Sequence, residues 1–168
     1  MPETQRTYIP REMRLLSEFV AKEYPNDQVF FNLRLGAIRP DLDIAGLSPA
    51  EVRMLGVFRR FADAIVIRPD KLIIIEASIR PDPGKLSQLQ LYERLVPATP
   101  ELEPYQGLKI RKLLLWSFLD EVLASIAREQ GVVVRVFHPA WVDEYLDSLS
   151  PRKRRASKSG FLEQPVGG

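Results

Sequence analysis

The most continuous apolar stretches of the chain lie near its middle, over residues 64–68 and 71–76. Runs this rich in isoleucine and valine are typical of strands that are covered on both faces of a sheet. Between them, Pro69 and Asp70 favour a short reversal, because proline presets φ and aspartate hydrogen-bonds to its own backbone. The pattern therefore predicts a hairpin of two central strands.

Helix and strand signals recur on both sides of this hairpin. The segment SPAE at residues 48–51 has the form of a capping box, and Asp82 followed by Pro83 marks another helix start. The other strands are expected at residues 28–36, 108–118 and 132–138, and the helices at about 11–24, 48–57, 83–95, 120–130 and 140–149. One hairpin among strand–helix–strand units predicts an α/β fold with a mixed sheet flanked by helices.

Two of these segments also indicate which side chains face the core. In the first helix, an apolar stripe runs opposite a polar face with three acidic residues: the stripe is Leu15, Leu16, Phe19 and Val20, and the acids are Glu12, Glu18 and Glu23. In the first strand, alternation predicts one apolar face opposite Asn32 and Arg34: Val29, Phe31, Leu33 and Leu35.

The composition is that of an ordinary globular protein, with 168 residues, 45% of them hydrophobic and 27% charged. We expect one domain over residues 1–150 and a basic, flexible tail over residues 151–168. The chain has a net charge of +2, and without the tail its body is slightly acidic. The chain has no cysteine, which excludes disulfides, zinc–thiolate sites and thiol nucleophiles. There is no apolar signal core and no apolar run of the ~20 residues that span a bilayer, so a cytoplasmic protein is expected.

The turn also predicts the register of the hairpin. If Arg68 pairs with Lys71, then Asp63 stands opposite Glu76. Directly opposed like charges are destabilising unless a cation, a shared proton or a third charge lies between them. A bulge or an odd turn would place the two carboxylates on different faces. The plain alternative to a functional site is ion pairing of these acids with nearby basic residues: Arg59, Arg60 or Arg80.

Four residues in this part of the chain carry a family resemblance: Asp63, Glu76, Gln88 and Tyr92. The segment resembles the core of PD-(D/E)XK nucleases, in particular the RecB-like branch. That branch has an aspartate on one strand, E-x-K on the next and Q-x-x-x-Y on the following helix. The resemblance implies a restriction-endonuclease-like fold and Mg²⁺- or Mn²⁺-dependent hydrolysis of nucleic acid, with DNA as the expected partner. A phage or mobile-element origin fits such an enzyme.

One position departs from the family pattern, because Ser78 stands where E-x-K has its lysine. Lys85 is the candidate substitute, since it opens the next helix at spacings of three and seven residues from Gln88 and Tyr92. The resemblance implies that Asp63 and Glu76 bind the metal, with Glu18 as a further ligand from the first helix, a role for which Glu12 and Glu23 compete. It also implies that Gln88 and Tyr92 line the edge of the site.

Two other interpretations remain open at this point. The loss of the E-x-K lysine fits a catalytically degenerate member of the same fold that acts as a binding or assembly module. The other is an unrelated α/β domain in which the acid pair is fortuitous. His138 is the only histidine, and we expect it to be structural. Trp116 and Trp141 fit either the core or an interface of a homo-oligomer or larger complex.

Overall fold

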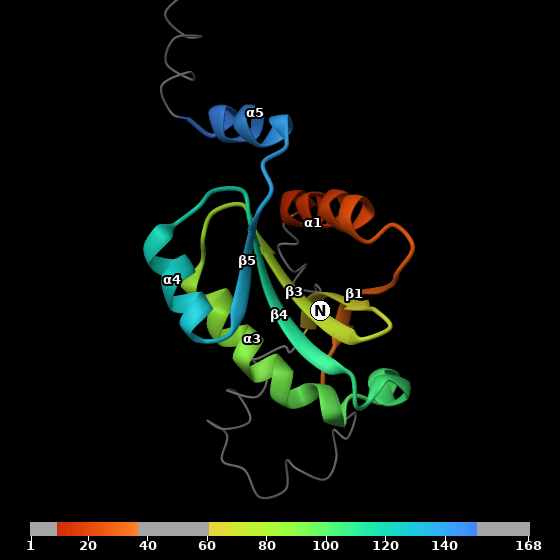
Figure 1. Ribbon diagram of the computed structural model, residues 1–168. Helices are drawn as coiled ribbons and strands as arrows, with labels where there is room; N and C mark the ends of the chain where they lie inside the picture. Colours follow the sequence, from red (N-terminus) through yellow and green to blue (C-terminus); the bar gives the residue numbers. More distant parts are fainter. Residues whose placement is uncertain (1–9, 37–60, 151–168) are drawn as a thin grey trace, which may run out of the picture. The chain divides into compact units, whose positions relative to one another are not determined.

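The computed structural model describes residues 10–36 and 61–150 (Figure 1). The chain forms two compact units, Met1–Phe137 and His138–Gly168. The first unit contains, in chain order, α1 (Pro10–Glu23), β1 (Gln28–Arg34), β2 (Phe61–Ile67), β3 (Lys71–Ser78), α3 (Pro83–Leu95), the 3₁₀ helices η1 (Val96–Ala98) and η2 (Pro100–Tyr105), β4 (Lys109–Trp116), α4 (Glu121–Glu129) and β5 (Val132–Val136). The second unit contains α5 (Ala140–Ser148).

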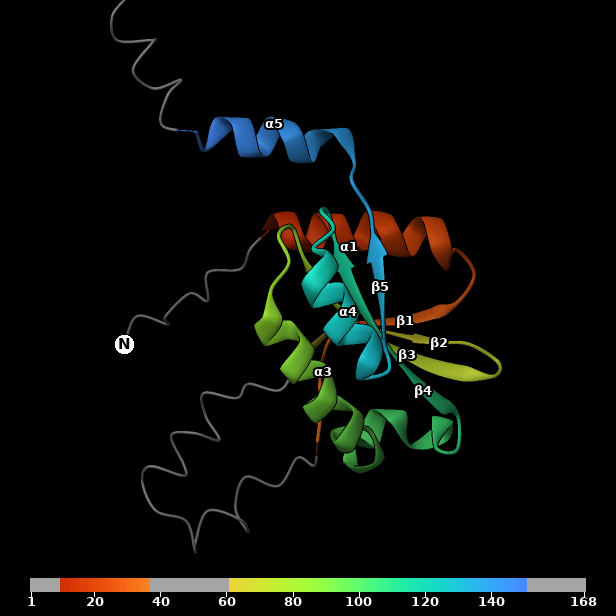
Figure 2. The same cartoon turned by 60° about the vertical axis from the view of Figure 1, so that its left-hand side comes forward.

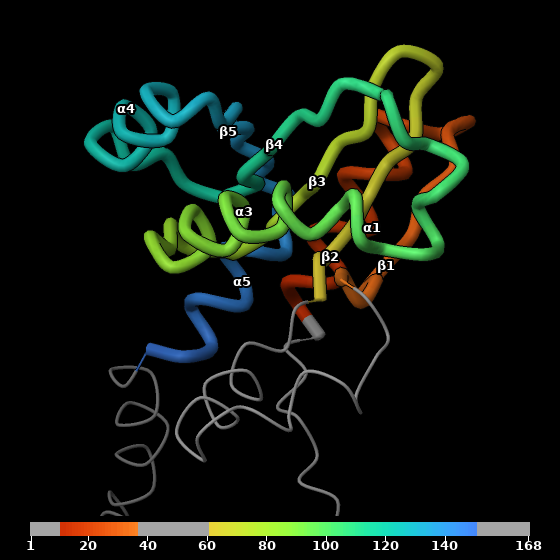
Figure 3. The backbone as a smooth tube through the Cα atoms, turned by 90° about the horizontal axis from the view of Figure 1, so that it is seen from below, coloured from red at the N-terminus to blue at the C-terminus, as the bar shows by residue number. Residues whose placement is uncertain are grey.

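The five strands form one sheet in the order β1-β2-β3-β4-β5, which Figure 3 follows from right to left. β1, β2 and β3 pair antiparallel, whereas β3, β4 and β5 pair parallel. The antiparallel half contains the tight hairpin, and the parallel half needs the helical crossovers α3 and α4, as parallel strands do. The predicted α/β fold with a mixed sheet and flanking helices is therefore confirmed.

Helices cover both faces of this sheet, so β2 and β3 are buried as their apolar runs predict. α3 and α4 lie on one face and α1 on the other (Figures 1 and 2). The larger core lies under α3 and α4 and consists of Leu35, Ala62, Ile65, Leu72, Ile74, Leu86, Leu89, Tyr92, Val96, Leu102, Leu114, Trp116, Ala124, Ala127 and Val132. On the other face, α1 packs against β2 and β3, and its buried stripe is Leu15, Leu16, Phe19 and Val20.

The ends of α3 and α4 follow the sequence signals closely. The side chain of Asp82 accepts a hydrogen bond of 2.8 Å from the backbone of Gly84, with Pro83 at the first helical position. Asp120 caps α4 in the same way through the backbone of Leu123. These caps fix where each helix leaves the sheet, and for α3 that point lies beside the acidic pair.

β1 departs from the predicted alternation at Asn32. This residue has φ of 52°, in the left-handed region, and does not pair with β2, although its neighbours on both sides do. The pleat changes phase there, so that Phe30 and Leu33 both pack against the larger core, while Phe31 is 43% exposed. The prediction that Phe31 shares a core face with Leu33 was therefore wrong, because simple alternation assumes an unbroken pleat.

Some predictions fall outside the described residues. These are the helix at 48–57 and the basic tail at 151–168. The extent of the domain, residues 1–150, stays a prediction. In the second unit, α5 follows Pro139, and the Nε2 atom of His138 lies 2.9 Å from the Oδ1 atom of Asp143. In the described ranges, no helix has the length and apolar character needed to cross a membrane.

The core under α3 gives a first prediction. Leu89 is fully buried there, so Leu89→Ala should lower the free energy of unfolding by about 2–5 kcal/mol, through lost transfer energy and the cavity left behind. Leu119 is 52% exposed, and Leu119→Ala should change stability by no more than about 0.5 kcal/mol. Urea denaturation of both variants measures the difference. Equal losses for the two leucines would contradict the described packing.

Candidate functional site

The hairpin has the register that its turn predicts. The backbone N–H of Arg68 donates to the carbonyl of Lys71 at 2.9 Å, and Ile65 pairs with Ile74. Regular pairing between β2 and β3 continues up to Ala64 and Ile75. The next opposed positions are those of the two acids, so the prediction that they face each other across the hairpin is confirmed.

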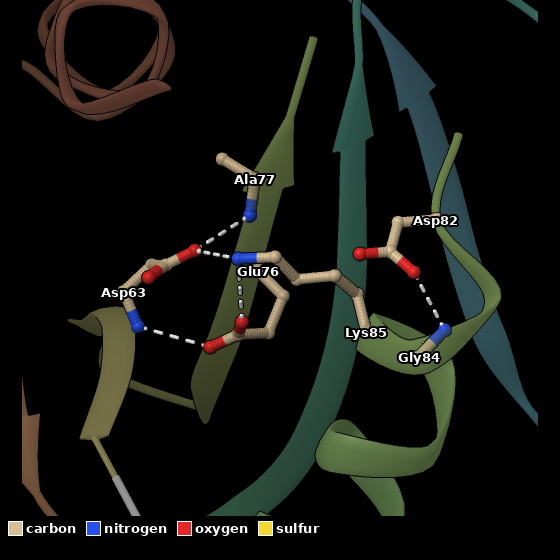
Figure 4. A network of polar contacts seen from close by, with 6 residues as sticks. All are labelled: Asp63, Glu76, Ala77, Asp82, Gly84 and Lys85. Carbon is tan, nitrogen blue, oxygen red and sulfur yellow. Dashed lines mark hydrogen bonds and ion pairs between the residues drawn. The ribbon is translucent and has the colours of Figure 1, made fainter. Parts of the chain in front are cut away.

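At these positions, side chains replace the backbone ladder (Figure 4). The backbone N–H of Asp63 donates to Oε1 of Glu76 at 3.0 Å, and the backbone N–H of Ala77 donates to Oδ2 of Asp63 at 3.0 Å. Each carboxylate thus accepts a hydrogen bond from the opposite strand. This exchange holds both acidic side chains in fixed positions at the end of the hairpin.

Lys85 supplies the third charge between the two acids. Its Nζ atom lies 2.9 Å from Oδ2 of Asp63 and 3.2 Å from Oε2 of Glu76. The side chain reaches them from the first turn of α3, which the Asp82 cap holds at the end of β3 (Figure 4). Side-chain exposure is 25% for Asp63, 17% for Lys85 and 1% for Glu76. The site is therefore open to solvent at Asp63 and closed at Glu76.

Burial and mutual charge set the protonation behaviour of this triad. Burial, followed by the negative charge of Asp63, raises the pKa of Glu76 to about 8, and Lys85 acts in the opposite direction. Burial by itself would lower the pKa of Lys85, but the charges of Glu76 and Asp63 outweigh it and hold that pKa above its ordinary value. Lys85 therefore stays protonated at physiological pH, and Glu76 holds its proton more strongly than an exposed glutamate does.

Tyr92 and Gln88, the two residues of the Q-x-x-x-Y pattern, have different surroundings. Tyr92 is buried in the larger core, and burial together with the charges of Glu76 and Asp63 raises the pKa of its phenol. Its hydroxyl therefore stays protonated beside the carboxylates. Gln88 lies on the exposed side of α3. The charges of the triad thus act on Tyr92, while the proposed roles of Tyr92 and Gln88 stay predictions.

The acidic residue of α1 that faces the triad is Glu12. It is half-buried, and its pKa is raised chiefly by burial, lowered by Lys85 and raised by Asp63, while it accepts a hydrogen bond from the backbone of Ile79. It does not lie on the polar face of α1, where we expected it because it is charged. The sequence held a signal for this, because Glu12 stands three and four residues before Leu15 and Leu16, in line with the apolar stripe.

Glu18 lies elsewhere on α1. Six residues separate it from Glu12, which turns it about 120° around the helix axis. Its Oε1 atom lies 3.0 Å from Nε of Arg14, an ion pair between partly exposed side chains. The role of Glu18 as a metal ligand stays a prediction, whereas the charges of Lys85 and Asp63 do act on the pKa of Glu12.

Ser78, the last residue of β3, carries no charge. It is buried on β3, and its hydroxyl has no hydrogen-bond partner within the described part of the chain. Ser78 lies two residues from Glu76 and therefore on the same side of the strand. Ser78 is too small and uncharged to pair with Glu76, and the cation beside Glu76 is Lys85.

The donor set fits a small divalent cation with few protein ligands. Carboxylate oxygens are the ligands that Mg²⁺ and Mn²⁺ prefer, and Mg²⁺ usually keeps several waters beside one or two carboxylates. Across residues 10–36 and 61–150, no three His, Cys, Asp or Glu side chains gather as a ready-made metal cage. Asp63 and Glu76 would thus hold such an ion together with water and a substrate oxygen.

Comparisons with known proteins give a limited result. No protein-family model and no curated protein matches the sequence. Among solved structures, the chain is similar to a repair endonuclease from Pyrococcus abyssi, with 16% identity and a TM-score of 0.44, over 75% of this chain and 46% of that one. It is also similar to EndoMS in a complex with double-stranded DNA, with 16% identity and a TM-score of 0.45, over 75% and 44%. The chain spans less than half the length of either protein.

The raised pKa of Glu76 predicts how stability changes with pH. A carboxyl whose pKa is higher in the folded than in the unfolded protein contributes stability that is fully present below its ordinary pKa of 4.5 and is lost as pH rises through about 8. In metal-free protein, we therefore compare the free energies of unfolding of wild type and Glu76→Gln. The wild-type value minus the variant value should decrease as the pH rises across this window, by at most about 1.4 kcal/mol per pH unit. Urea denaturation in EDTA at several pH values measures it, and parallel curves for the two proteins would refute the shift.

Proposed function

We propose that this protein is a metal-dependent nuclease of the PD-(D/E)XK type that hydrolyses phosphodiester bonds in DNA with Mg²⁺ or Mn²⁺. The observation that carries the proposal is the sharing of one ammonium group, that of Lys85, by the carboxylates of Asp63 and Glu76. Two acids and a lysine from two adjacent strands and the following helix thus meet at one partly exposed point.

The arrangement suits phosphodiester hydrolysis in charge as well as in residue type. A Mg²⁺ or Mn²⁺ ion held by the two carboxylates supplies a water of lowered pKa and neutralises charge on the phosphate. The ammonium of Lys85 is fixed within hydrogen-bond reach of both carboxylates and can stabilise the negative charge that develops on the phosphate oxygens. The phenol of Tyr92, whose pKa is raised, stays protonated and can act as a hydrogen-bond donor.

The restriction-endonuclease-like family assignment is part of the same proposal. It is supported by the mixed sheet with its β2–β3 hairpin, by the facing acids, and by the position of Lys85 at the start of the next helix. Glu12 joins the proposed site as a carboxylate on α1 whose charge influences Lys85. Glu18 and Gln88 are proposed contributors on the strength of the sequence resemblance.

One observation favours the second candidate function, a binding or assembly module without catalysis. Both carboxylates already have partners, because each accepts a backbone hydrogen bond and shares Lys85. These contacts would also stabilise a partly buried acidic pair in a protein that binds no metal or substrate there. The two functions differ in whether the triad acts on substrate, and mutation of the triad separates them.

Activity of the triad variants tests the proposal. Purified wild-type protein should cut single- or double-stranded DNA in Mn²⁺ or Mg²⁺ and should not cut in EDTA. Asp63→Asn, Glu76→Gln and Lys85→Met should each lower the cleavage rate by at least about 100-fold, because each removes a charge that acts on the phosphate or the metal. Cleavage of labelled DNA on denaturing gels measures the rates.

The matched control is Glu129→Gln, which removes an exposed acid at the end of α4 and should cut at the wild-type rate. Thermal unfolding of all variants separates lost chemistry from lost folding. If the wild-type protein cuts no nucleic acid with either metal, while it still binds DNA, the module without catalysis is the better description.

A further inference from the structure

The position of Lys85 has a consequence for how metal and substrate bind, and this consequence rests on the proposed function. We propose that Lys85 acts as an internal cation that occupies the carboxylate pair in the free protein, and that substrate phosphate draws it away, so that metal and nucleic acid bind cooperatively. The site is then nearly closed to metal until a phosphodiester is present.

Most oxygens of the two carboxylates are already in use. Oδ2 of Asp63 accepts from the backbone of Ala77 and from Nζ of Lys85. Oε1 of Glu76 accepts from the backbone of Asp63, and Oε2 contacts Nζ of Lys85. Oδ1 of Asp63 is the one oxygen of the pair for which the described residues provide no hydrogen bond. A metal that binds the two oxygens facing Lys85, Oδ2 of Asp63 and Oε2 of Glu76, must therefore compete with the ammonium.

These contacts differ in how readily they can be given up. The two backbone hydrogen bonds come from β2 and β3, which are held inside the sheet by β1 and β4. Lys85 comes from the exposed first turn of α3, and its side chain has four rotatable methylene groups. Moving the ammonium costs no backbone hydrogen bond. Lys85 is therefore the partner that can leave.

An ammonium and a divalent cation cannot share the space between the same carboxylates. Lys85 contacts both acids at 2.9 and 3.2 Å, so a metal on the inner oxygens would lie next to a positive charge with little solvent between them. Metal entry thus requires that Lys85 leave the pair. Its alternative partner is a phosphate oxygen of the substrate, which binds a lysine ammonium as a point charge.

Two equilibria are linked by this exchange. Phosphate binding to Lys85 frees the carboxylates for metal, and metal binding frees Lys85 for phosphate. The affinity of each ligand then rises by the same factor when the other is present. Direct contact between the bound metal and the phosphate adds a further gain that does not involve Lys85, so only a Lys85 variant isolates the exchange.

Calorimetric titration of Mn²⁺ tests the coupling, with and without a short phosphorothioate DNA duplex that resists cleavage. For wild type, the DNA should tighten Mn²⁺ binding by about 5- to 150-fold. Lys85→Gln removes the charge but keeps an amide that can donate to both carboxylates. In the absence of DNA it should bind Mn²⁺ at least about tenfold more tightly than wild type, and DNA should add a clearly smaller gain.

Lys109→Met is the matched control, because it removes an exposed lysine at the start of β4 and should behave as wild type in both titrations. Circular dichroism and thermal unfolding verify that Lys85→Gln is folded, and the reciprocal titration of DNA into wild type with and without Mn²⁺ gives the same factor without any variant. Equal Mn²⁺ affinities of wild type and Lys85→Gln, or equal gains from DNA, overturn the exchange and leave the nuclease proposal intact. Absence of Mn²⁺ binding in every protein, with and without DNA, overturns both.

Discussion

The carboxylate of Glu76 is the constraint on which the site depends, because a charge almost fully removed from water is strongly unfavourable unless it is paired and hydrogen-bonded. Two features of the fold meet this requirement. The hairpin register brings the backbone N–H of Asp63 to one oxygen, and the start of α3 brings the ammonium of Lys85 to the other. Turn, cap and helix start therefore act together on a single buried acid.

Much of this arrangement could be predicted from local sequence, because the signals involved are short-range. Pro69 and Asp70 define a turn, the turn defines the register, and the register places Asp63 opposite Glu76. The cap at Asp82 defines the first turn of α3 and with it the position of Lys85. No long-range information is needed for any of these steps, since each follows from fewer than about twenty residues of chain.

The features that could not be predicted depend on contacts between distant segments. Asn32 breaks the pleat of β1 at the position that would pair with Asp63, and only the assembled sheet shows that β2 is unpaired there on both sides. Glu12 lies 51 positions before Asp63 in the chain, and its charge suggested a solvated face. Its orientation toward Lys85 follows from how α1 packs on the sheet, which the pattern of one helix does not determine.

The positive charge of the triad comes from the start of a helix, at Lys85, and not from position 78 on the strand. A lysine at position 78 would extend from the middle of a sheet, where β3 is paired with β4 along its whole length, and its stem would be confined by that packing. Lys85 instead extends from a helix end that is held to the loop by the bond between Asp82 and Gly84. The cation is therefore carried by a long side chain on a helix end, while both carboxylates extend from strands of the sheet. A fixed acid pair with a movable counter-charge is the physical arrangement that lets one site pass between a self-neutralised and a ligand-bound state.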